Sequence, residues 1–190
     1  MRLAFLAAML LAVLPAPAPA ALAEGANAPH FSAPAALAGR QFTYSLAESL
    51  KKGPVVVYFY PSAYTAGCNV QAHTFSQRMA EFTAAGASVI GVSLDDIGRL
   101  EEFSADPDYC AGRLAVASDA DGSIAKGFDL TVRNVTGVND SRGRAITHGF
   151  AERTTFIVTP DGRIARTIGG LNPKENVEQS LAAVRALGKR

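Results

Sequence analysis

Residues 55–68, VVVYFYPSAYTAGC, govern the interpretation of the rest of the chain. The run 55–60 is apolar and aromatic and rich in β-favouring residues, which is typical of a central strand covered on both faces. PSAYTAGC then breaks the strand, and apolar residues recur at 68, 72, 75, 79 and 82 until Gly86. That spacing predicts an amphipathic helix with a glycine stop. Cys68 is therefore expected in the first turn of a helix that follows a buried strand.

The remaining segments alternate between strand and helix patterns. Strands are expected at 41–46, 89–94 and 114–117, a helix at 97–103, and a hairpin with arms 155–158 and 163–168 around the turn TPDG. Asn172 and Pro173 are suited to cap and open a final helix. A β-α-β unit followed by a hairpin and a closing helix predicts an α/β domain of thioredoxin-like fold. Its central mixed β-sheet should be flanked by helices.

Residues 1–23 have the features of a secretory signal peptide. Arg2 gives a basic start, residues 3–14 form an apolar core, and residues 21–23, ALA, are a small-x-small cleavage site. The apolar core is well short of the ~20 residues that span a bilayer. We expect a cleaved leader and a periplasmic or otherwise exported domain at 24–190, with no membrane association after cleavage. A retained membrane anchor is the alternative.

Without its first 23 residues the chain has 167 residues, and the loss of Arg2 changes the formal net charge from +1 to zero. This length suits one domain that buries roughly 70% of its unfolded surface. A neutral surface without a basic block gives no reason to expect nucleic acid or anionic lipid as a partner. The two cysteines, Cys68 and Cys110, could pair in an oxidising compartment.

The expected position of Cys68 favours a reactive thiol over a purely structural one. Open α/β sheets place their reactive groups at the carboxyl ends of the strands, where this residue is expected. Thr65, three residues earlier, is placed to cap the helix with its hydroxyl, and the free amides of the first turn favour a thiolate. An ordinary buried cysteine remains the alternative.

Two separated motifs carry a resemblance to a known family. Pro61, Thr65 and Cys68 form the pattern P-x-x-x-T-x-x-C behind a strand ending in FY. Arg153, in the segment ERTTFIVTPDGRI, opens the strand before the TPDG turn. Together they resemble the peroxiredoxin active site, over residues 27–188. The nearest group is similar to the Q-type, or bacterioferritin-comigratory, peroxiredoxins, here in an exported form.

The resemblance implies a role for each of these residues. Cys68 would be the peroxidatic nucleophile that reduces hydrogen peroxide or an organic hydroperoxide, without metal, haem or flavin. Thiolate formation alone is not a sufficient catalyst, because a thiol that ionises more easily is also a weaker nucleophile. Thr65 and Arg153 would therefore act as hydrogen-bond donors that polarise the O–O bond, and Pro61 would shield the thiolate.

The resemblance also implies a role for the second cysteine. Many Q-type members carry a resolving cysteine five residues after the peroxidatic one, where this chain has His73. Cys110 would then resolve the sulfenic acid within one chain, after local unwinding of the first helical turn and of residues 106–112, which have few apolar anchors. A thioredoxin-like protein would reduce the disulfide, and a monomer or small dimer is expected.

A different class of function stays open on the residues alone. The chain could be a non-catalytic thioredoxin-fold binding domain with a structural Cys68–Cys110 disulfide, worth about 4 kcal/mol from loop closure. The three histidines lack ligand spacing, so no metal site is expected. Residues 119–122, DADG, are expected to form a turn that starts a helix rather than a calcium loop.

Overall fold

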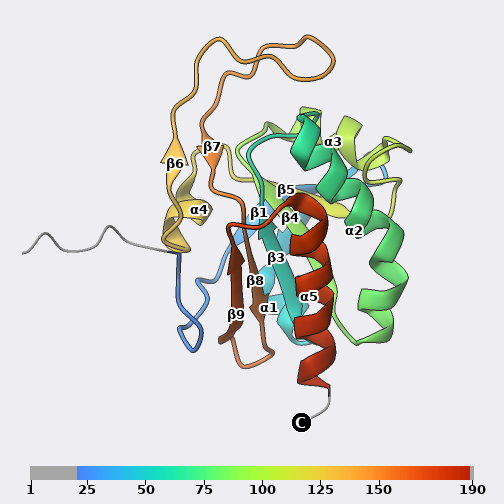
Figure 1. Ribbon diagram of the computed structural model, residues 1–190, viewed down its shortest axis with the longest axis vertical. Coiled ribbons are helices and arrows are strands. Elements are labelled where there is room, and N and C mark those ends of the chain that lie inside the picture. The colour runs from blue at the N-terminus through green and yellow to red at the C-terminus, as the bar shows by residue number, and fades with distance from the viewer. Residues whose placement is uncertain (1–20, 189–190) are drawn as a thin grey trace, which may run out of the picture.

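The computed structural model describes residues 21–188, and seven strands form its central sheet. The strand order is β2-β1-β5-β4-β3-β8-β9 (Figure 1). The strands are β1 (Ser32–Leu37), β2 (Arg40–Ser45), β3 (Val55–Phe59), β4 (Ser88–Ser93), β5 (Ala115–Ser118), β8 (Thr154–Val158) and β9 (Ile164–Gly169). β3 and β4 are parallel, as are β4 and β5, whereas β8 is antiparallel to β3 and β1 is antiparallel to β5. The predicted mixed sheet is confirmed.

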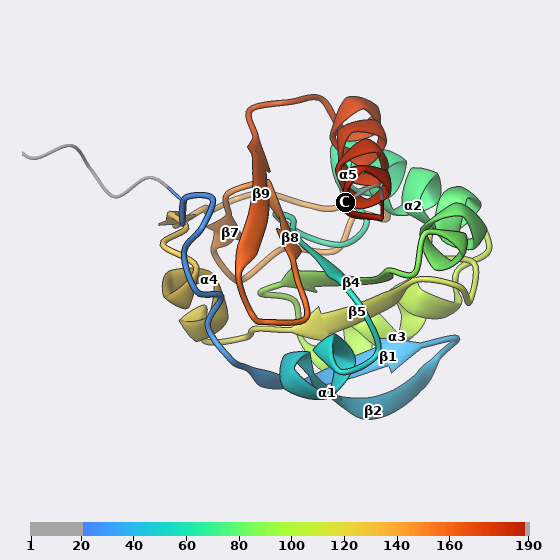
Figure 2. The same cartoon turned by 90° about the horizontal axis from the view of Figure 1, so that it is seen from below.

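Helices cover both faces of this sheet. One hydrophobic cluster joins α2 (Ala66–Ala84), α3 (Ile97–Ala105) and α5 (Pro173–Leu187) to one face, and a second joins α1 (Leu46–Leu50) and α4 (Ser123–Gly127) to the other. Figure 2 shows α2 and α5 side by side, with α1 on the opposite side of the sheet. Asn172 accepts a hydrogen bond from the amide of Glu175, and Pro173 is the first residue of α5, so the predicted cap is confirmed.

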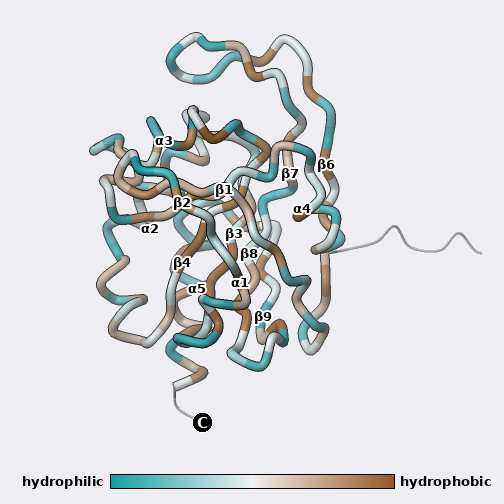
Figure 3. The backbone as a smooth tube through the Cα atoms, turned by 180° about the vertical axis from the view of Figure 1, so that it is seen from behind, coloured by the Kyte–Doolittle hydropathy of each residue, from teal (hydrophilic) through white to brown (hydrophobic). Residues whose placement is uncertain are grey.

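Strand β3 supplies side chains to both clusters. Val56 and Tyr58 face the cluster under α2, while Val55, Val57 and Phe59 face the cluster under α1. All five are buried because alternate residues of a strand point to opposite faces. Figure 3 shows this hydrophobicity concentrated on the central strands and the hydrophilic residues on many of the connections.

The register of β3 against β8 positions two parts of the site. Phe59 pairs with Thr154 in the antiparallel ladder. Arg153, just before β8, and the turn after β3 therefore leave the sheet at the same end. Gly91 of β4 pairs with Tyr58, and a Cβ at this position would lie 2.5 Å from the tyrosine ring. Only glycine lets this aromatic side chain lie across the neighbouring strand.

Several elements were not predicted. β1 reads SAPAAL, and alanine and proline are poor strand formers, so its sequence gives little β signal. The short helix α1 and the two-stranded ribbon of β6 (Val132–Arg133) and β7 (Phe150–Ala151) were also missed. The expected turn at 119–122 does start a helix, α4. The predicted leader falls mainly on residues 1–20, outside the described residues, and none of the helices described in 21–188 is long and apolar enough to cross a membrane.

Candidate active site

Cys68 is the third residue of α2, and its side chain is only 2% exposed. Thr65 is the N-cap, with an extended backbone (φ −101°, ψ 146°). The first-turn amides of a helix have no partners within the helix and carry partial positive charge. The sulfur therefore belongs to a buried side chain at the electropositive end of a 19-residue helix.

Arg153 is the charged partner of this sulfur. Its Nη2 donates a hydrogen bond to the Cys68 Sγ over 3.3 Å, and its Nη1 donates to Gln71 Oε1. The two motifs separated by 85 positions in the sequence thus meet at one atom. A guanidinium at this distance stabilises negative charge on sulfur, and it is also a donor for an oxygen that approaches the sulfur.

A buried polar chain fixes the guanidinium from behind. Gln71 is fully buried and donates through Nε2 to Asn176 Oδ1 over 3.0 Å. Asn176 Oδ1 also accepts from the Thr155 hydroxyl over 2.7 Å, and its Nδ2 donates to the Ile168 carbonyl. Each of these side chains is satisfied by the next one, so the orientation of Gln71 Oε1 toward Arg153 is fixed.

Gly67 makes room for this arrangement. A Cβ on Gly67 would lie 3.2 Å from Arg153 Nη2 and 3.6 Å from the Pro173 ring. The glycine lies directly before Cys68, so a side chain there would push the guanidinium away from the sulfur. Gly67, Gln71 and Asn176 were not predicted from the sequence. The sequence did hold a signal for two of them, because each is a polar residue on a largely apolar helix face. Gln71 lies one turn after Cys68 in α2, and Asn176 lies beside Val177 in α5.

The expected role of the Thr65 hydroxyl in capping is wrong. Thr65 is the N-cap by backbone conformation, but its side chain makes no capping bond. Its hydroxyl instead donates to the Ser62 carbonyl over 2.8 Å. Because a hydroxyl has one proton, Thr65 offers lone pairs, not a free donor, toward the pocket. Pro61 lies half-buried, separated by Tyr60 from the last residue of β3.

Cys110 lies in the same buried cluster as Cys68, and both are free thiols. Cys110 is fully buried, and burial, with a smaller contribution from Asp106, raises the pKa of its thiol well above the ordinary value. The neighbouring Tyr109 ring stacks on Phe103 at 5.5 Å. The expectation of few apolar anchors in this segment is therefore wrong. The structure contains no Cys68–Cys110 disulfide of the kind that the binding-domain alternative requires.

The segment around Cys110 is hydrogen-bonded to α2, and one of its residues has an unfavourable backbone conformation. His73 Nδ1 lies 2.8 Å from the Asp108 carbonyl, so α2 is hydrogen-bonded to this segment. Ala111 has a left-handed backbone (φ +52°), which is unfavourable for a residue with a Cβ.

Within residues 21–188, no group of three or more His, Cys, Asp or Glu is arranged to hold a metal ion.

The geometry agrees with what comparison with known proteins shows. Residues 25–167 match the AhpC/TSA family. The chain belongs to the AhpC/TSA family. It is 28% identical to peroxiredoxin Bcp of Xanthomonas campestris over 136 residues, which cover 72% of this chain and 79% of the relative.

Solved structures agree with this assignment. The structure resembles peroxidoxin BcpB of Mycobacterium tuberculosis with a TM-score of 0.72 and 26% identity, covering 87% of this chain and 98% of that one. It also resembles the bacterioferritin comigratory protein of Xanthomonas campestris, a protein with alkyl peroxide reduction activity, with a TM-score of 0.65 and 26% identity over 82% of this chain and 91% of that one. The protein is a Bcp-like peroxiredoxin with a thioredoxin-like fold, and hence a thiol peroxidase.

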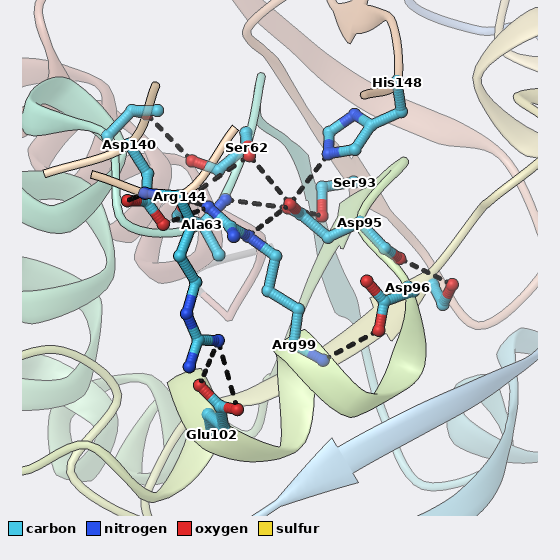
Figure 4. Close-up of polar contacts among 12 residues, drawn as sticks. Ser62, Ala63, Ser93, Asp95, Asp96, Arg99, Glu102, Asp140, Arg144 and His148 are labelled. Atoms are coloured by element: carbon cyan, nitrogen blue, oxygen red, sulfur yellow. Dashed lines mark hydrogen bonds and ion pairs between the residues drawn. The ribbon is translucent and has the colours of Figure 1, made fainter. Parts of the chain in front are cut away.

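The loop of residues 61–65 in this peroxiredoxin, which we call the β3–α2 loop, is supported by a buried carboxylate (Figure 4). Asp95 is fully buried at the end of β4. It accepts hydrogen bonds of 2.7 Å from the Ser62 hydroxyl, the Ala63 amide and the Ser93 hydroxyl. Burial alone would raise the pKa of Asp95, but hydrogen bonds from His148, the Ala63 amide and Ser62 outweigh it and lower that pKa.

Two cations face this carboxylate. Arg99 Nε lies 2.9 Å from Asp95 Oδ1, and Arg99 Nη2 donates to the Ala63 carbonyl and to Asp140. His148 Nε2 lies 2.9 Å from the same Asp95 oxygen, while its Nδ1 lies 2.9 Å from the Gly149 carbonyl. Both ring nitrogens thus face acceptors, and only an imidazolium can donate to both. Burial would lower the pKa of His148, but the bonds to Asp95 and Gly149 raise it overall.

This pair predicts a pH-dependent contribution to stability. His148→Gln should lower the free energy of unfolding by roughly 1–2 kcal/mol at pH 5.5, because one charge-assisted hydrogen bond is lost. A raised folded pKa gives stability that is fully present below the unfolded value of 6.5 and is lost as pH rises through the folded pKa. The difference between wild type and variant should therefore shrink toward pH 9.

Urea unfolding of both proteins between pH 5 and 9 measures this difference. His30 and His73 are present in both proteins, so the comparison isolates the contribution of His148. A difference that stays constant over this range would mean that His148 acts only as a neutral hydrogen-bonding group.

Proposed function

We propose that Cys68 is the peroxidatic cysteine of this thiol peroxidase and that Arg153 is its electrophilic partner. The observation that carries this assignment is the 3.3 Å hydrogen bond from Arg153 Nη2 to a buried sulfur at a helix N-terminus. The thiolate attacks one peroxide oxygen, the O–O bond breaks, and Cys68 becomes a sulfenic acid while water or an alcohol leaves. Arg153 stabilises the charge that develops on the leaving oxygen.

Thr65 takes a role different from the expected donor. Its proton is already given to the Ser62 carbonyl, so its lone pairs accept a hydrogen bond from the peroxide O–H. Substrate would then be oriented by an acceptor on one side and a cationic donor on the other. Pro61 is half-buried between β3 and Thr65, and we assign it the shielding of the thiolate from bulk water.

Cys110 is proposed as the resolving cysteine. Its thiol attacks the Cys68 sulfenic acid, so that a disulfide forms and water leaves. In its buried site the raised pKa keeps this thiol protonated, and protonated thiols are poor nucleophiles. Release of residues 106–112 therefore exposes the thiol and makes it reactive at the same time. The left-handed Ala111 gives up its strain in that opening.

The reducing partner is proposed to be a dithiol protein of the thioredoxin type. Thiol–disulfide exchange would transfer two electrons to the Cys68–Cys110 bond and regenerate both thiols. One chain holds both cysteines in one buried cluster, which supports a cycle that needs no second subunit. A monomer or small dimer is sufficient for such a cycle.

Export is proposed from the leader-like sequence of residues 1–23. The contacts of Leu22 bear on where the leader is cut. Its amide donates to the Phe128 carbonyl over 3.2 Å, and its carbonyl accepts from the Thr167 hydroxyl over 2.6 Å. Cleavage after Ala23 would remove both bonds, whereas cleavage after Ala20 would keep them. N-terminal sequencing of the secreted protein separates these two sites and the uncut form.

Replacement of the nucleophile tests the first assignment. Cys68→Ser should reduce peroxide consumption at least ~10³-fold, because a hydroxyl is not ionised at neutral pH. The fold should persist, since Ser is smaller than Cys and fills the same site. Peroxide consumption and circular dichroism on the same sample check both points, and activity within ten-fold of wild type would remove Cys68 from this role.

The position of the guanidinium can be tested separately from its presence. Arg153→Met should lower kcat/KM by roughly 10²-fold or more, as the loss of one transition-state donor does, and Thr65→Val should have an effect of similar order. Gly67→Ala retains the arginine but displaces it from the sulfur, since the new Cβ would lie 3.2 Å from Nη2. It should lower kcat/KM by about ten-fold at unchanged or higher thermal stability, because alanine favours helix. Near-normal rates in all three variants would assign peroxide activation to other groups.

The resolving step has its own signature. Cys110→Ser should leave the first peroxide reduction fast, but Cys68 should accumulate as sulfenic acid and proceed to sulfinic acid. Peptide mass spectrometry after one equivalent of peroxide should find a Cys68–Cys110 disulfide in wild type only. Sustained thioredoxin-linked turnover by Cys110→Ser at the wild-type rate, with no such disulfide in wild type, would instead indicate an external resolving thiol.

A further inference from the structure

A long excursion of the chain, residues 134–149, lies between β6 and β7, and we call it the arm. Figures 1 and 3 show it rising from the ribbon and reaching over α3. Its tip is ordered by its own hydrogen bonds. The Asp140 amide donates to the Arg144 carbonyl over 2.9 Å, and the Asp140 carboxylate accepts from the amides of Arg142 and Arg144. The arm is thus a defined structure and not a loose connection.

The arm contacts Tyr64, a residue of the β3–α2 loop. The guanidinium carbon of Arg142 lies 3.3 Å from the centroid of the Tyr64 ring, and the Ser141 amide donates to the Tyr64 carbonyl over 2.8 Å. The ring also packs edge-on against Phe103 at 5.0 Å. The arm therefore grips both the side chain and the main chain of Tyr64.

Tyr64 is held in an unfavourable conformation. Its φ is +60°, in the left-handed region, which disfavours a residue with a Cβ by roughly ten-fold. Such a conformation persists only where the surroundings impose it. Tyr64 directly precedes Thr65, the N-cap of α2, so its backbone angles set the direction in which the chain enters the turn that contains Cys68.

We propose that Arg142 is a positioning residue that keeps the first turn of α2 folded by holding Tyr64. This inference rests on the proposed role of Cys110. Once Cys68 is a sulfenic acid, two reactions compete. Attack by the Cys110 thiol gives a disulfide and water, and requires opening. Attack by the sulfenate on a second peroxide gives a sulfinic acid and water or an alcohol, and needs the closed pocket. By slowing opening, the arm raises the fraction of Cys68 that becomes sulfinic acid.

The expected size of the effect follows from the contact that is lost. A cation over an aromatic ring at a partly exposed site shifts a conformational equilibrium by about five-fold. Arg142 also bonds to Glu102 over 2.8 Å, so loss of that ion pair must be controlled. Arg144 supplies the control, because it bonds to the same Glu102 over 3.0 Å but has no contact with the Tyr64 ring among those observed.

The experiment compares Arg142→Met with Arg144→Met in the full mature chain. Hydrogen exchange followed by mass spectrometry measures the opening of residues 65–70 in the reduced protein. Stepwise addition of hydrogen peroxide, with quantification of Cys68 sulfinic acid and of the Cys68–Cys110 peptide, measures the partition. Arg142→Lys keeps the charge without the planar stacking surface and should give an intermediate value.

Arg142→Met should raise exchange at residues 65–70 and lower the sulfinic fraction at equal peroxide, each by about five-fold, while Arg144→Met stays within two-fold of wild type. Equal behaviour of the two methionine variants would overturn the positioning role of Arg142, as would an increased sulfinic fraction in Arg142→Met. Failure of the proposed resolving step is distinguishable, because wild type would then form no Cys68–Cys110 disulfide although exchange in Arg142→Met could still rise.

Discussion

The site depends on one charged contact, the guanidinium of Arg153 placed beside the buried sulfur of Cys68. Arg153 is partly buried, and a cation withdrawn from water is costly unless its donors are satisfied and its geometry is fixed. Much of the surrounding sequence serves this requirement. Gly67 leaves space for the guanidinium, and Gln71 accepts a hydrogen bond from its Nη1. Asn176 of α5 in turn accepts a hydrogen bond from Gln71 and holds it in place. In the proposed reaction the same charge stabilises first the thiolate and then the leaving oxygen.

The β3–α2 loop must be rigid for one step of the proposed cycle and must open for another. Asp95 and Arg99 bind the main chain and side chains of the loop at residues 62 and 63, while the arm binds residue 64. Peroxide reduction benefits from this rigidity, because the donors must not reorganise during the reaction. The proposed disulfide between Cys68 and Cys110 requires the same region to open. Tyr64 precedes the first of the two segments that would move and Ala111 lies within the second, so opening would release backbone strain at both residues.

The sequence was sufficient for the parts of the fold that obey a simple period. The continuous apolar run of β3 and the spacing along α2 predicted both elements, and the two motifs identified Cys68 and Arg153, which are in contact. It was insufficient where the outcome depends on tertiary contacts. The hydroxyl of Thr65 had two acceptable partners, the helix amides and the Ser62 carbonyl, and only the packed loop selects between them. Likewise, the partners of Asp95 come from four separate segments, and no spacing in the sequence predicts that they meet.

The burial of Cys110 has a consequence for the resting enzyme. A thiol that is fully enclosed and held in its protonated form reacts slowly with small oxidised thiols, with electrophiles and with the peroxide itself. In the proposed cycle this thiol supplies the second reducing equivalent, so its burial keeps that equivalent from reacting before Cys68 has been oxidised. The equivalent becomes available only when residues 106–112 open, and this opening sets the order of the two oxidation steps.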